Sequence, residues 1–384
     1  MSGPKIYKRE NVYEAALERI RWCFDEFPEV VVSVSGGKDS TVLFNLAMIV
    51  AREKGRLPLR VSWIDQEAEW QATADTVREQ MYHPDVTPHW YQMPIRLFNA
   101  TSTTEHWLEC WNPEDEDRWM RERDPIAITE NVYGTDRFGE LFKAIPKVEF
   151  PDTRVCYLAG VRTEESPARF IGLTSDPTYK WATWGKRLSP GQQHVTMYPI
   201  YDWSYTDVWK AIHDNGWPYN PIYDAQYQHG VTPRMMRISN VHHETAVHAI
   251  WLIQEIEPET WEKLTQRLGG IDATGKIGRD DFFLTELPFM FGSWREYRDY
   301  LLEKLIEKED WRDGFRKIFA RQEKLYAEEI GDVLYRVHCN SIITNDWEHV
   351  KLKNFEAAPN IYAIRKDRAR RERKEREQNE QSEG

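Results

Sequence analysis

Cysteines and long apolar runs are scarce in this sequence, and Lys and Arg are outnumbered by Asp and Glu; each of these features argues against a class of protein. The four cysteines among 384 residues are scattered, with no CxxC pair and no metal-ligand spacing, so we expect neither a disulfide framework nor a zinc or iron–sulfur site. No apolar run approaches the length of a membrane span, and residues 1–10 are polar and lack the apolar core of a signal peptide. We therefore expect a cytoplasmic protein without membrane contact.

Charge is unevenly distributed along the chain. The formal net charge is −12, which argues against nonspecific nucleic-acid binding by the whole surface. The segment from Arg365 to Arg376 is an exception, because it carries eight Lys or Arg residues against three Asp or Glu residues. We expect residues 363–384 to form a basic, flexible tail. Two interpretations stay open for it, a frayed or solvated helix and a contact for DNA or a partner.

Apolar periodicity divides the chain into an α/β part and a helical part. Helical patterns alternate with short β-branched or apolar runs, which predict strands at 30–34, 60–65, 89–92 and 154–162. This alternation is typical of a parallel α/β sheet. We expect an α/β domain over residues 1–236 with a Trp-rich, acidic insertion at about 101–134, and a mainly helical C-terminal region over 237–362.

The link between the first predicted strand and its helix is very short and reads "SGGKDS". A turn this tight leaves N–H groups at the start of the helix without partners and directs the positive end of the helix dipole beyond the strand. Gly36 and Gly37 allow close backbone approach to an oxyanion, Lys38 adds a charge, and Ser35 and Ser40 add hydroxyl donors. The segment predicts an anion-binding loop; the alternative is an ordinary βα turn.

Charged side chains follow two further predicted strands, at the edge where parallel α/β sheets bind ligands. Asp65 ends the second strand, where its carboxylate suits ribose hydroxyls or a metal ion, with helix capping as the alternative. Gly160 and Arg162 follow the strand at 154–162, and Arg suits bidentate recognition of phosphate or sulfate. Glu165 and Arg169 lie four residues apart, so they either join this site or form only a helical ion pair.

Three sequence blocks occur in an order that resembles a known family. "SGGKDS", "GVRTEES" and "PIYDWSYTDVWKAIHDNGWPYNPIYD" together resemble the phosphoadenosine phosphosulfate reductase family of the PP-loop, or nucleotide α-hydrolase, superfamily. The resemblance covers residues 30–230. It implies a Rossmann-like PP-loop ATP pyrophosphatase fold, a five-stranded parallel sheet with helices on both faces. It also implies that the loop holds the β,γ-pyrophosphate of ATP while the α-phosphorus is attacked.

The sequence departs from the reductases where their thiol chemistry resides. Those enzymes use a cysteine in a C-terminal motif of the type Cys-Gly-Leu-His, whereas the only late cysteine here is Cys339, in "VHCNS". Sulfonucleotide reduction is therefore disfavoured. Sulfur transfer or reduction would fall to Cys110 or Cys156. We expect Cys156 to be a core residue of its strand, which leaves Cys110 as the one thiol that could be exposed.

A second resemblance concerns the region after the predicted domain boundary. Residues 235–270 resemble the C-terminal extension of a reductase-like subgroup, which includes co-activators of prophage gene expression associated with immunoglobulin-binding regulators. This resemblance implies a ParB-like protein partner. Similar PP-loop proteins occur in DNA phosphorothioation and phage-defence systems, so it also implies a phage-related, DNA-modification or defence context.

Together these features predict an ATP α-hydrolase or adenylyltransferase. Backbone N–H groups of residues 36–40, with Lys38 and Arg162, would bind pyrophosphate and stabilise its charge as it leaves. Mg²⁺ would bridge phosphate oxygens, with Asp39 as the favoured direct or water-mediated ligand and Asp65 as the next candidate. The products would be pyrophosphate and an adenylate or AMP. The alternative is a nucleotide-binding regulator that grips a partner or DNA, and a homo-oligomer is compatible with either.

Overall fold

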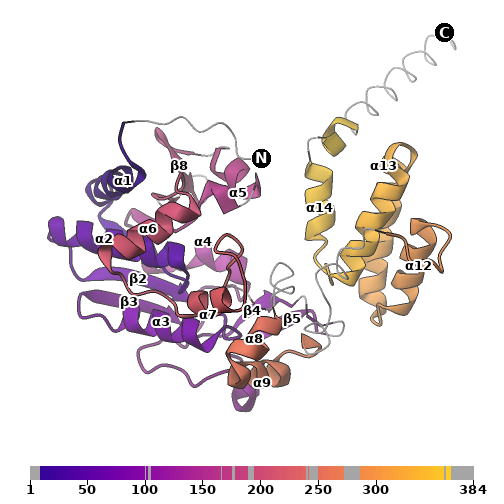
Figure 1. Cartoon of the computed structure of the whole chain (residues 1–384), viewed down its shortest axis with the longest axis horizontal. Helices are drawn as coiled ribbons and strands as arrows, with labels where there is room; N and C mark the ends of the chain where they lie inside the picture. Colours follow the sequence, from indigo (N-terminus) through magenta and orange to yellow (C-terminus); the bar gives the residue numbers. More distant parts are fainter. Residues whose placement is uncertain are drawn as a thin grey trace, which may run out of the picture. The chain divides into compact units, whose positions relative to one another are not determined.

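A mixed sheet forms the centre of the first of two units in this chain, shown in a computed structural model (Figure 1). Unit 1 comprises Met1–Leu97, Glu109–Val241 and Leu252–Arg267, and unit 2 comprises Phe98–Leu108, His242–Trp251 and Leu268–Gly384. The structure describes residues 9–99, 101–102, 105–165, 167–174, 178–188, 194–238, 241, 250–271, 286–358 and 360–364. The domain boundary near residue 236 stays a prediction.

The sheet contains the predicted parallel strands and an antiparallel extension. Its order is β3 (Val86–Tyr91), β2 (Leu59–Ile64), β1 (Glu29–Ser33), β6 (Val155–Leu158), β9 (His194–Met197), β8 (Ala182–Arg187) and β7 (Thr178–Tyr179). The first five of these strands are parallel, which confirms the predicted α/β fold. β8 runs antiparallel to β9, and β7 runs antiparallel to β8. This hairpin lengthens the sheet beyond the expected five strands.

Alternate residues of β1 face two separate layers. Val30 and Val32 lie in a core with buried residues of α1 (Val12–Glu26), α2 (Lys38–Glu53), α3 (Gln71–Met81) and α6 (Tyr205–Asn215). Val31 faces the other way and packs with Phe150, which directly follows α4 (Phe138–Glu149). A β-branched run with one polar interruption is typical of a strand buried on both faces. Helices therefore cover both faces, as predicted.

The start of α2 is set by local backbone geometry. Gly37 is its N-cap, with an extended conformation (φ −84°, ψ 158°), and the helix begins at Lys38. Buried side chains then recur at helical spacing, among them Val42, Leu46 and Val50, which are fully inaccessible. Gly55, with φ +63°, follows the last turn. Because β1 ends at Ser33, only a few residues separate the strand from the helix.

Smaller elements complete unit 1 and lead into unit 2. They are the two-stranded sheet of β4 (Ile95–Phe98) and β5 (Trp107–Cys110), the 3-10 helices η1 (Pro113–Arg118) and η2 (Thr163–Glu165), and the helices α5 (Pro167–Thr174), α7 (Ile222–Gln228), α8 (Trp251–Ile256) and α9 (Pro258–Arg267). The predicted insertion at 101–134 thus contains β5 and η1 among irregular segments.

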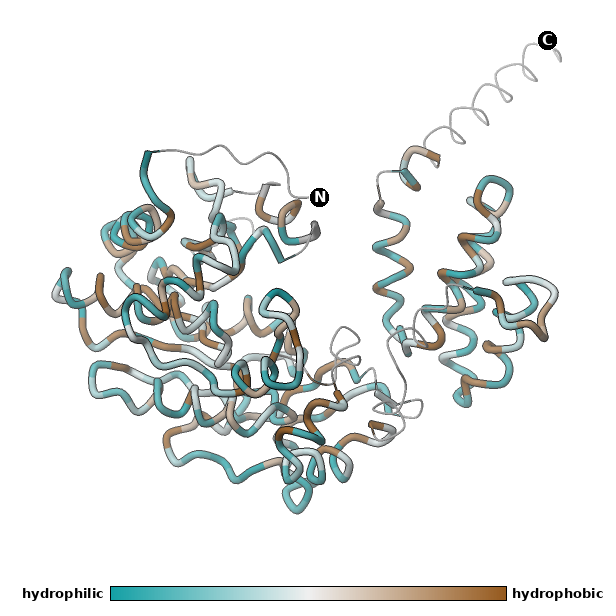
Figure 2. The backbone as a smooth tube through the Cα atoms, in the orientation of Figure 1, coloured by the Kyte–Doolittle hydropathy of each residue, from teal (hydrophilic) through white to brown (hydrophobic). Residues whose placement is uncertain are grey.

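Unit 2 is mainly helical. The helices that the structure describes there are α12 (Trp294–Lys304), α13 (Glu309–Ile343), which is interrupted at Ile330, and α14 (Val350–Ala357). Apolar and polar residues are interspersed along α14 (Figure 2), in which Leu352 is buried and Val350 is exposed. In the described part of the chain, no helix combines the length and apolar character needed to cross a membrane. Residues 365–384 of the predicted basic tail lie outside the described residues.

Candidate functional site

A cavity of about 560 Å³ lies at the carboxyl ends of the central parallel strands. Its volume falls within the range of about 300–1,000 Å³ that is usual for small-molecule sites. Eight of the predicted site residues line it: Ser35, Gly37, Lys38, Asp39, Ser40, Gly160, Glu165 and Arg169. The fold thus brings together the loop after β1 and the segment after β6. Gly36, Asp65 and Arg162 are not among the lining residues.

The loop owes its shape to two glycines and a serine. Gly36 has φ +67°, and a Cβ there would lie 2.8 Å from Thr73 Cγ2, so a larger residue would be strained. Ser40 Oγ accepts the Ser35 N–H at 3.1 Å and donates to the Gly37 carbonyl at 3.0 Å. Ser40 therefore stabilises the turn itself. The first N–H groups of α2 remain directed along the helix axis, which is the arrangement that favours an anion.

The segment before and within α7 supports the loop from behind. Tyr223 Oη accepts the Lys38 N–H at 3.0 Å. The Asn220 side-chain amide, fully buried, donates to Thr73 Oγ1 at 3.0 Å and to the Gly36 carbonyl at 3.4 Å. Burial, and next the Asp39 charge, raise the pKa of Tyr223, so its phenol stays protonated. The sequence argument missed both residues, although they lie in the quoted "NPIYD".

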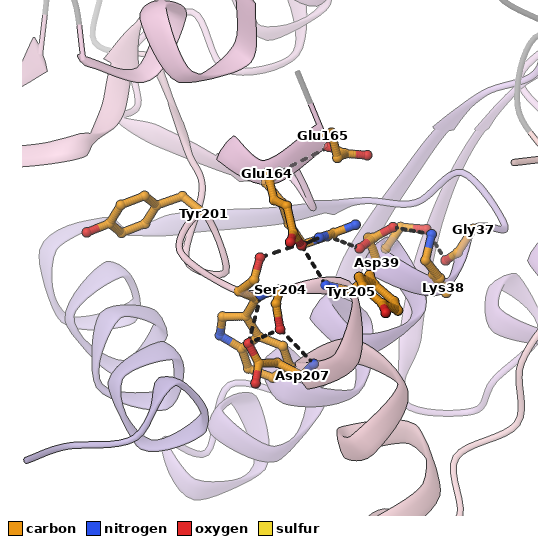
Figure 3. Close-up of polar contacts among 12 residues, drawn as sticks. Gly37, Lys38, Asp39, Glu164, Glu165, Tyr201, Ser204, Tyr205 and Asp207 are labelled. Atoms are coloured by element: carbon orange, nitrogen blue, oxygen red, sulfur yellow. Dashed lines mark hydrogen bonds and ion pairs between the residues drawn. The ribbon is translucent and has the colours of Figure 1, made fainter. Parts of the chain in front are cut away.

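A partly buried chain of charges extends from the loop to α6 (Figure 3). Lys38, 7% exposed, places Nζ 3.2 Å from Asp39 Oδ2, and the other Asp39 oxygen pairs with Arg162 Nε. Arg162 Nη1 lies 3.2 Å from Glu164 Oε2, which also accepts the Tyr205 N–H at 2.8 Å. Arg162 therefore contacts Asp39 and Glu164 in this structure and lies outside the cavity lining.

The α6 end of this network is held by a capping box. Ser204 N donates to Asp207 Oδ2 at 2.7 Å, and Asp207 N donates to Ser204 Oγ at 3.2 Å (Figure 3). Reciprocal capping of this kind fixes the start of a helix. The Tyr205 N–H that contacts Glu164 is therefore presented by a fixed helix terminus, which in turn restrains Arg162 and Asp39.

Two arginines add positive charge to the cavity lining. Arg169 forms the ion pair with Glu165 that the four-residue spacing predicts, and both residues line the cavity. Arg237, an exposed residue, lines it as well. Partial desolvation of the exposed Arg169 side chain, and next the nearby charge of Arg237, lower the pKa of Arg169. Lys38, Arg169 and Arg237 thus provide three cationic side chains around one cavity.

Another part of the lining is apolar, with two polar side chains beside it. The apolar residues are Trp63 and Ile64 of β2 and Phe138, Leu141, Phe142, Ile145 and Pro146 of α4. Gln66 and Glu69, which follow β2, are 8% and 4% exposed. Within the described residues, Gln66 Oε1 and Glu69 Oε2 have no hydrogen-bond partner. Burial, and next the charge of Asp65, raise the pKa of Glu69 to about 8.

Asp65 lies in a separate, fully buried network. Its Oδ2 accepts the Trp90 Nε1–H at 3.0 Å and the Gln92 amide at 2.9 Å, while Oδ1 accepts the Glu67 N–H at 2.9 Å and pairs with Arg121. These contacts attach residues 111–124 to the end of β2. The structure therefore does not bring Asp65 into the cavity with Asp39, and the role of Asp65 toward ribose or Mg²⁺ stays a prediction.

The structure contradicts one prediction about the cysteines, the exposure of Cys110. Cys110 could be exposed according to the sequence argument, and this is wrong: all four cysteines are buried, and Cys110 is fully inaccessible. Its Sγ donates to the Gln66 carbonyl at 3.0 Å, and burial raises its pKa well above the usual value. β5 carries this thiol into the protein interior. Burial also raises the pKa of Cys339 to about 12, so neither thiol has the properties of a nucleophile.

Comparisons with known proteins agree with this architecture. The family model of the phosphoadenosine phosphosulfate reductase domain matches residues 29–275, and a model described as a domain of unknown function matches residues 230–365. The chain is 31% identical over 324 residues to the uncharacterized protein YbdN of Escherichia coli, covering 80% of this chain and 79% of that protein. An adenosine 5'-phosphosulfate reductase of Lysinibacillus sphaericus is 23% identical over 224 residues, covering 58% and 79% of the two chains.

Two solved structures are similar at low sequence identity. A phosphoadenylyl-sulfate reductase from Candida auris, in a phosphate complex, has a TM-score of 0.33 at 16% identity and covers 62% of this chain and 98% of that chain. An FMN adenylyltransferase from Candida glabrata has a TM-score of 0.35 at 15% identity, covering 57% and 62%.

Proposed function

Because this chain belongs to the phosphoadenosine phosphosulfate reductase domain family, we propose that it is an ATP pyrophosphatase or adenylyltransferase of the PP-loop type. It would cleave ATP between the α- and β-phosphorus and transfer the adenylyl group to an acceptor, or to water with release of AMP. One observation carries this proposal: Lys38 and the N-terminus of α2 line the same cavity as Arg169 and Arg237.

The pyrophosphate part of the nucleotide would bind at the loop. The N–H groups that follow Lys38 at the start of α2, together with the Lys38 ammonium, would provide donors and positive charge for phosphate oxygens. Lys38 pairs with Asp39 at 3.2 Å, so its ammonium already lies beside the helix terminus. Arg169 and Arg237 would contact the remaining phosphate oxygens or the acceptor. The protonated phenol of Tyr223, next to the Lys38 N–H, offers one more donor.

The reaction itself would be a displacement at phosphorus. An acceptor oxygen forms a bond to the α-phosphorus, and the bond from that phosphorus to the bridging oxygen breaks. Pyrophosphate leaves with the electron pair. Lys38 and the α2 N–H groups would stabilise the negative charge that develops on this leaving group. Since catalysis of this kind depends on positioning and electrostatics, it needs no protein nucleophile.

Arg162 would act through Asp39. Both are held in the chain of ion pairs that ends at the N-terminus of α6. We expect this arrangement to orient the Asp39 carboxylate and, through it, the Lys38 ammonium. Arg162 is then a positioning residue whose loss would disturb the loop without removing a phosphate ligand. This role differs from the direct phosphate contact that the sequence predicted.

Mg²⁺ would accompany the nucleotide. In the described part of the chain, no group of three or more His, Cys, Asp or Glu side chains could hold a metal ion. Asp39 is paired with Lys38 and Arg162, and Asp65 lies in its own buried network. The two predicted ligands therefore do not fit a preformed magnesium site, and Mg²⁺ enters only as a component of the assay.

The test is cleavage of α-labelled ATP by the purified chain, with Mg²⁺ or with a chelator, alone and with DNA or a ParB-like protein. We expect labelled AMP or an adenylate together with pyrophosphate. Lys38→Ala should lower the rate by on the order of 10²-fold or more, as for loss of other charge-stabilising donors. Arg162→Ala should lower the rate less and leave pyrophosphate binding measurable. An exposed control, Lys210→Ala on α6, should have no effect.

Two results would refute this proposal. Cleavage that persists in Lys38→Ala would show that the chemistry occurs elsewhere. Binding of ATP without Lys38-dependent turnover under any of these conditions would instead favour a nucleotide-binding regulator, acting with DNA or a ParB-like partner. A thiol-dependent reductase has no support from the buried cysteines.

A further inference from the structure

Two contacts tie the chain after β2 to helices that lie far later in the sequence. Arg267, the last residue of α9, forms a bidentate pair with Glu67, at 2.6 Å from Nε to Oε1 and 3.2 Å from Nη2 to Oε2. Glu257, between α8 and α9, accepts the Gln71 N–H at 2.8 Å and the Ala72 N–H at 3.0 Å. Both contacts lie within unit 1. The helices α8 and α9 therefore hold the chain after β2 at two points.

The first contact holds a backbone conformation that a glutamate rarely adopts. Glu67 has φ +60°, in the left-handed region that favours glycine. Its fully buried carboxylate also accepts the Trp111 N–H at 2.7 Å and the Met120 N–H at 3.3 Å. A residue in this region persists only where its surroundings over-determine its conformation. Arg267 supplies two charged donors to this carboxylate, so its loss would let the Glu67 backbone relax.

The second contact takes the place of a cap at the start of α3. The N-cap residue of this helix, Trp70, makes no side-chain capping hydrogen bond. The Glu257 carboxylate instead accepts the first two N–H groups of the helix, and Thr260 Oγ1 donates to it at 2.7 Å. A carboxylate at a helix N-terminus satisfies N–H groups that lack partners and interacts favourably with the helix dipole. The first turn of α3 therefore depends on Glu257 for its position.

Two side chains of the cavity adjoin these anchor points. Gln66 and Glu69 line the cavity, and both are buried. Gln66 directly precedes Glu67, and the Glu69 N–H donates to the Glu67 carbonyl at 2.9 Å. A change in the Glu67 backbone would therefore displace both cavity side chains. The glycine loop is held separately, by Tyr223 and Asn220.

We propose that Arg267 and Glu257 are positioning residues for nucleotide binding. Through them, α8 and α9 set the shape of the cavity wall that Gln66 and Glu69 form. Neither Arg267 nor Glu257 lines the cavity, so both act through the chain after β2. This inference rests on the proposed function, because it concerns the same cavity. It also gives a role in the nucleotide site to helices of the region 230–365, which matches the model described as a domain of unknown function.

Positioning of this kind works in both directions. A ligand that contacts Gln66 or Glu69 stabilises the chain after β2, and the same free energy then strengthens the contacts of this chain with α8 and α9. Pyrophosphate, which would bind at the glycine loop alone, lacks this effect. Binding of ATP to the full chain should therefore slow hydrogen exchange of the α9 amides, whereas binding of pyrophosphate should leave their exchange unchanged. A purely structural role of α9 in folding predicts no such response to ATP.

Calorimetry of the full chain with ATP and with pyrophosphate gives the second test. Glu257→Ala removes the cap of α3 and should weaken ATP binding about threefold or more, as for loss of other helix caps. Arg267→Lys keeps the charge without the bidentate geometry and should weaken ATP binding about tenfold, whereas pyrophosphate affinity should stay within about twofold for both variants. Glu257→Gln, which keeps one acceptor oxygen, should bind ATP more tightly than Glu257→Ala. Glu262→Ala, at an exposed position of α9, should change nothing.

Three results would overturn the inference: equal ATP affinity of the parent chain and the folded variants, equal losses for ATP and pyrophosphate, or unchanged α9 exchange when ATP is bound. If Arg267→Lys does not fold, Glu257→Ala decides. If ATP binding depends on Glu257 while no ATP is cleaved, the proposed reaction fails and this inference stands. If ATP is cleaved and its binding ignores both residues, the inference fails and the proposed reaction stands. If the folded chain binds no nucleotide, both fail.

Discussion

The buried carboxyl of Glu69 predicts a particular dependence of stability on pH. Its pKa is raised from 4.5 to about 8 by burial and by the charge of Asp65, so the folded chain keeps a proton that the unfolded chain loses above pH 4.5. Stability therefore falls as the pH rises from about 4.5 to about 8, and this contribution is constant above that window. At about 1.4 kcal/mol per pH unit, the cost at pH 7 is on the order of 3 kcal/mol.

Glu69→Gln removes the ionisable proton and keeps the shape of the side chain. The melting temperature of the variant minus that of the parent chain should be smallest near pH 5, rise steadily to about pH 8, and then level off. Thermal unfolding of both proteins in matched buffers from pH 5 to pH 9 measures this difference. A difference that is constant over this range would refute the assignment of a neutral buried Glu69. Glu79→Gln, an exposed carboxylate on α3, is the matched control and should give no trend.

Two further predictions concern a buried ion pair after β2 and the glycine loop before α2. The fully buried Glu67 pairs with Arg267 of α9 at 2.6 Å. Arg267→Met should therefore lower the free energy of unfolding by about 3–5 kcal/mol, because it leaves a buried carboxylate without its cation. Denaturant unfolding measures this loss, and a value below about 1 kcal/mol would contradict the prediction. Gly36→Ala should weaken pyrophosphate binding markedly and lower the melting temperature only slightly, since a Cβ at φ +67° meets Thr73 and shifts the loop. Gly139→Ala, with open space around its Cβ, is the control. Equal pyrophosphate affinities of the two variants would contradict the proposed loop geometry.

Much of the candidate site could be predicted because its signals are local. The strand β1, the loop and the start of α2 follow one another within a few residues, so the change of period and the two glycines define them together. Gly160 was likewise placed correctly beside the loop, since the ends of parallel strands share one edge. A Cβ at Gly160 would lie 3.0 Å from the backbone of Asp39, which explains why glycine fits there.

Other features depend on contacts between distant residues and left no readable local pattern. Cys110 was the one thiol that the sequence left as a candidate for exposure, yet β5 buries it against the carbonyl of Gln66, more than forty residues earlier in the chain. Tyr223 reaches Lys38 across an even longer separation. Neither residue type nor spacing could reveal these partners.

The sequence by itself determined the α/β architecture, the short glycine loop between β1 and α2 and the charged residues near it, because each depends on short-range periodicity, turn geometry or residue chemistry. Only the tertiary structure decided which carboxyl groups face the cavity. Asp65 and Glu69 lie four residues apart after the same strand, but Asp65 meets Trp90, Gln92 and Arg121 while Glu69 Oε2 meets no donor among the described residues. Their different environments come from distant segments, and a carboxyl group takes its charge and its function from those neighbours.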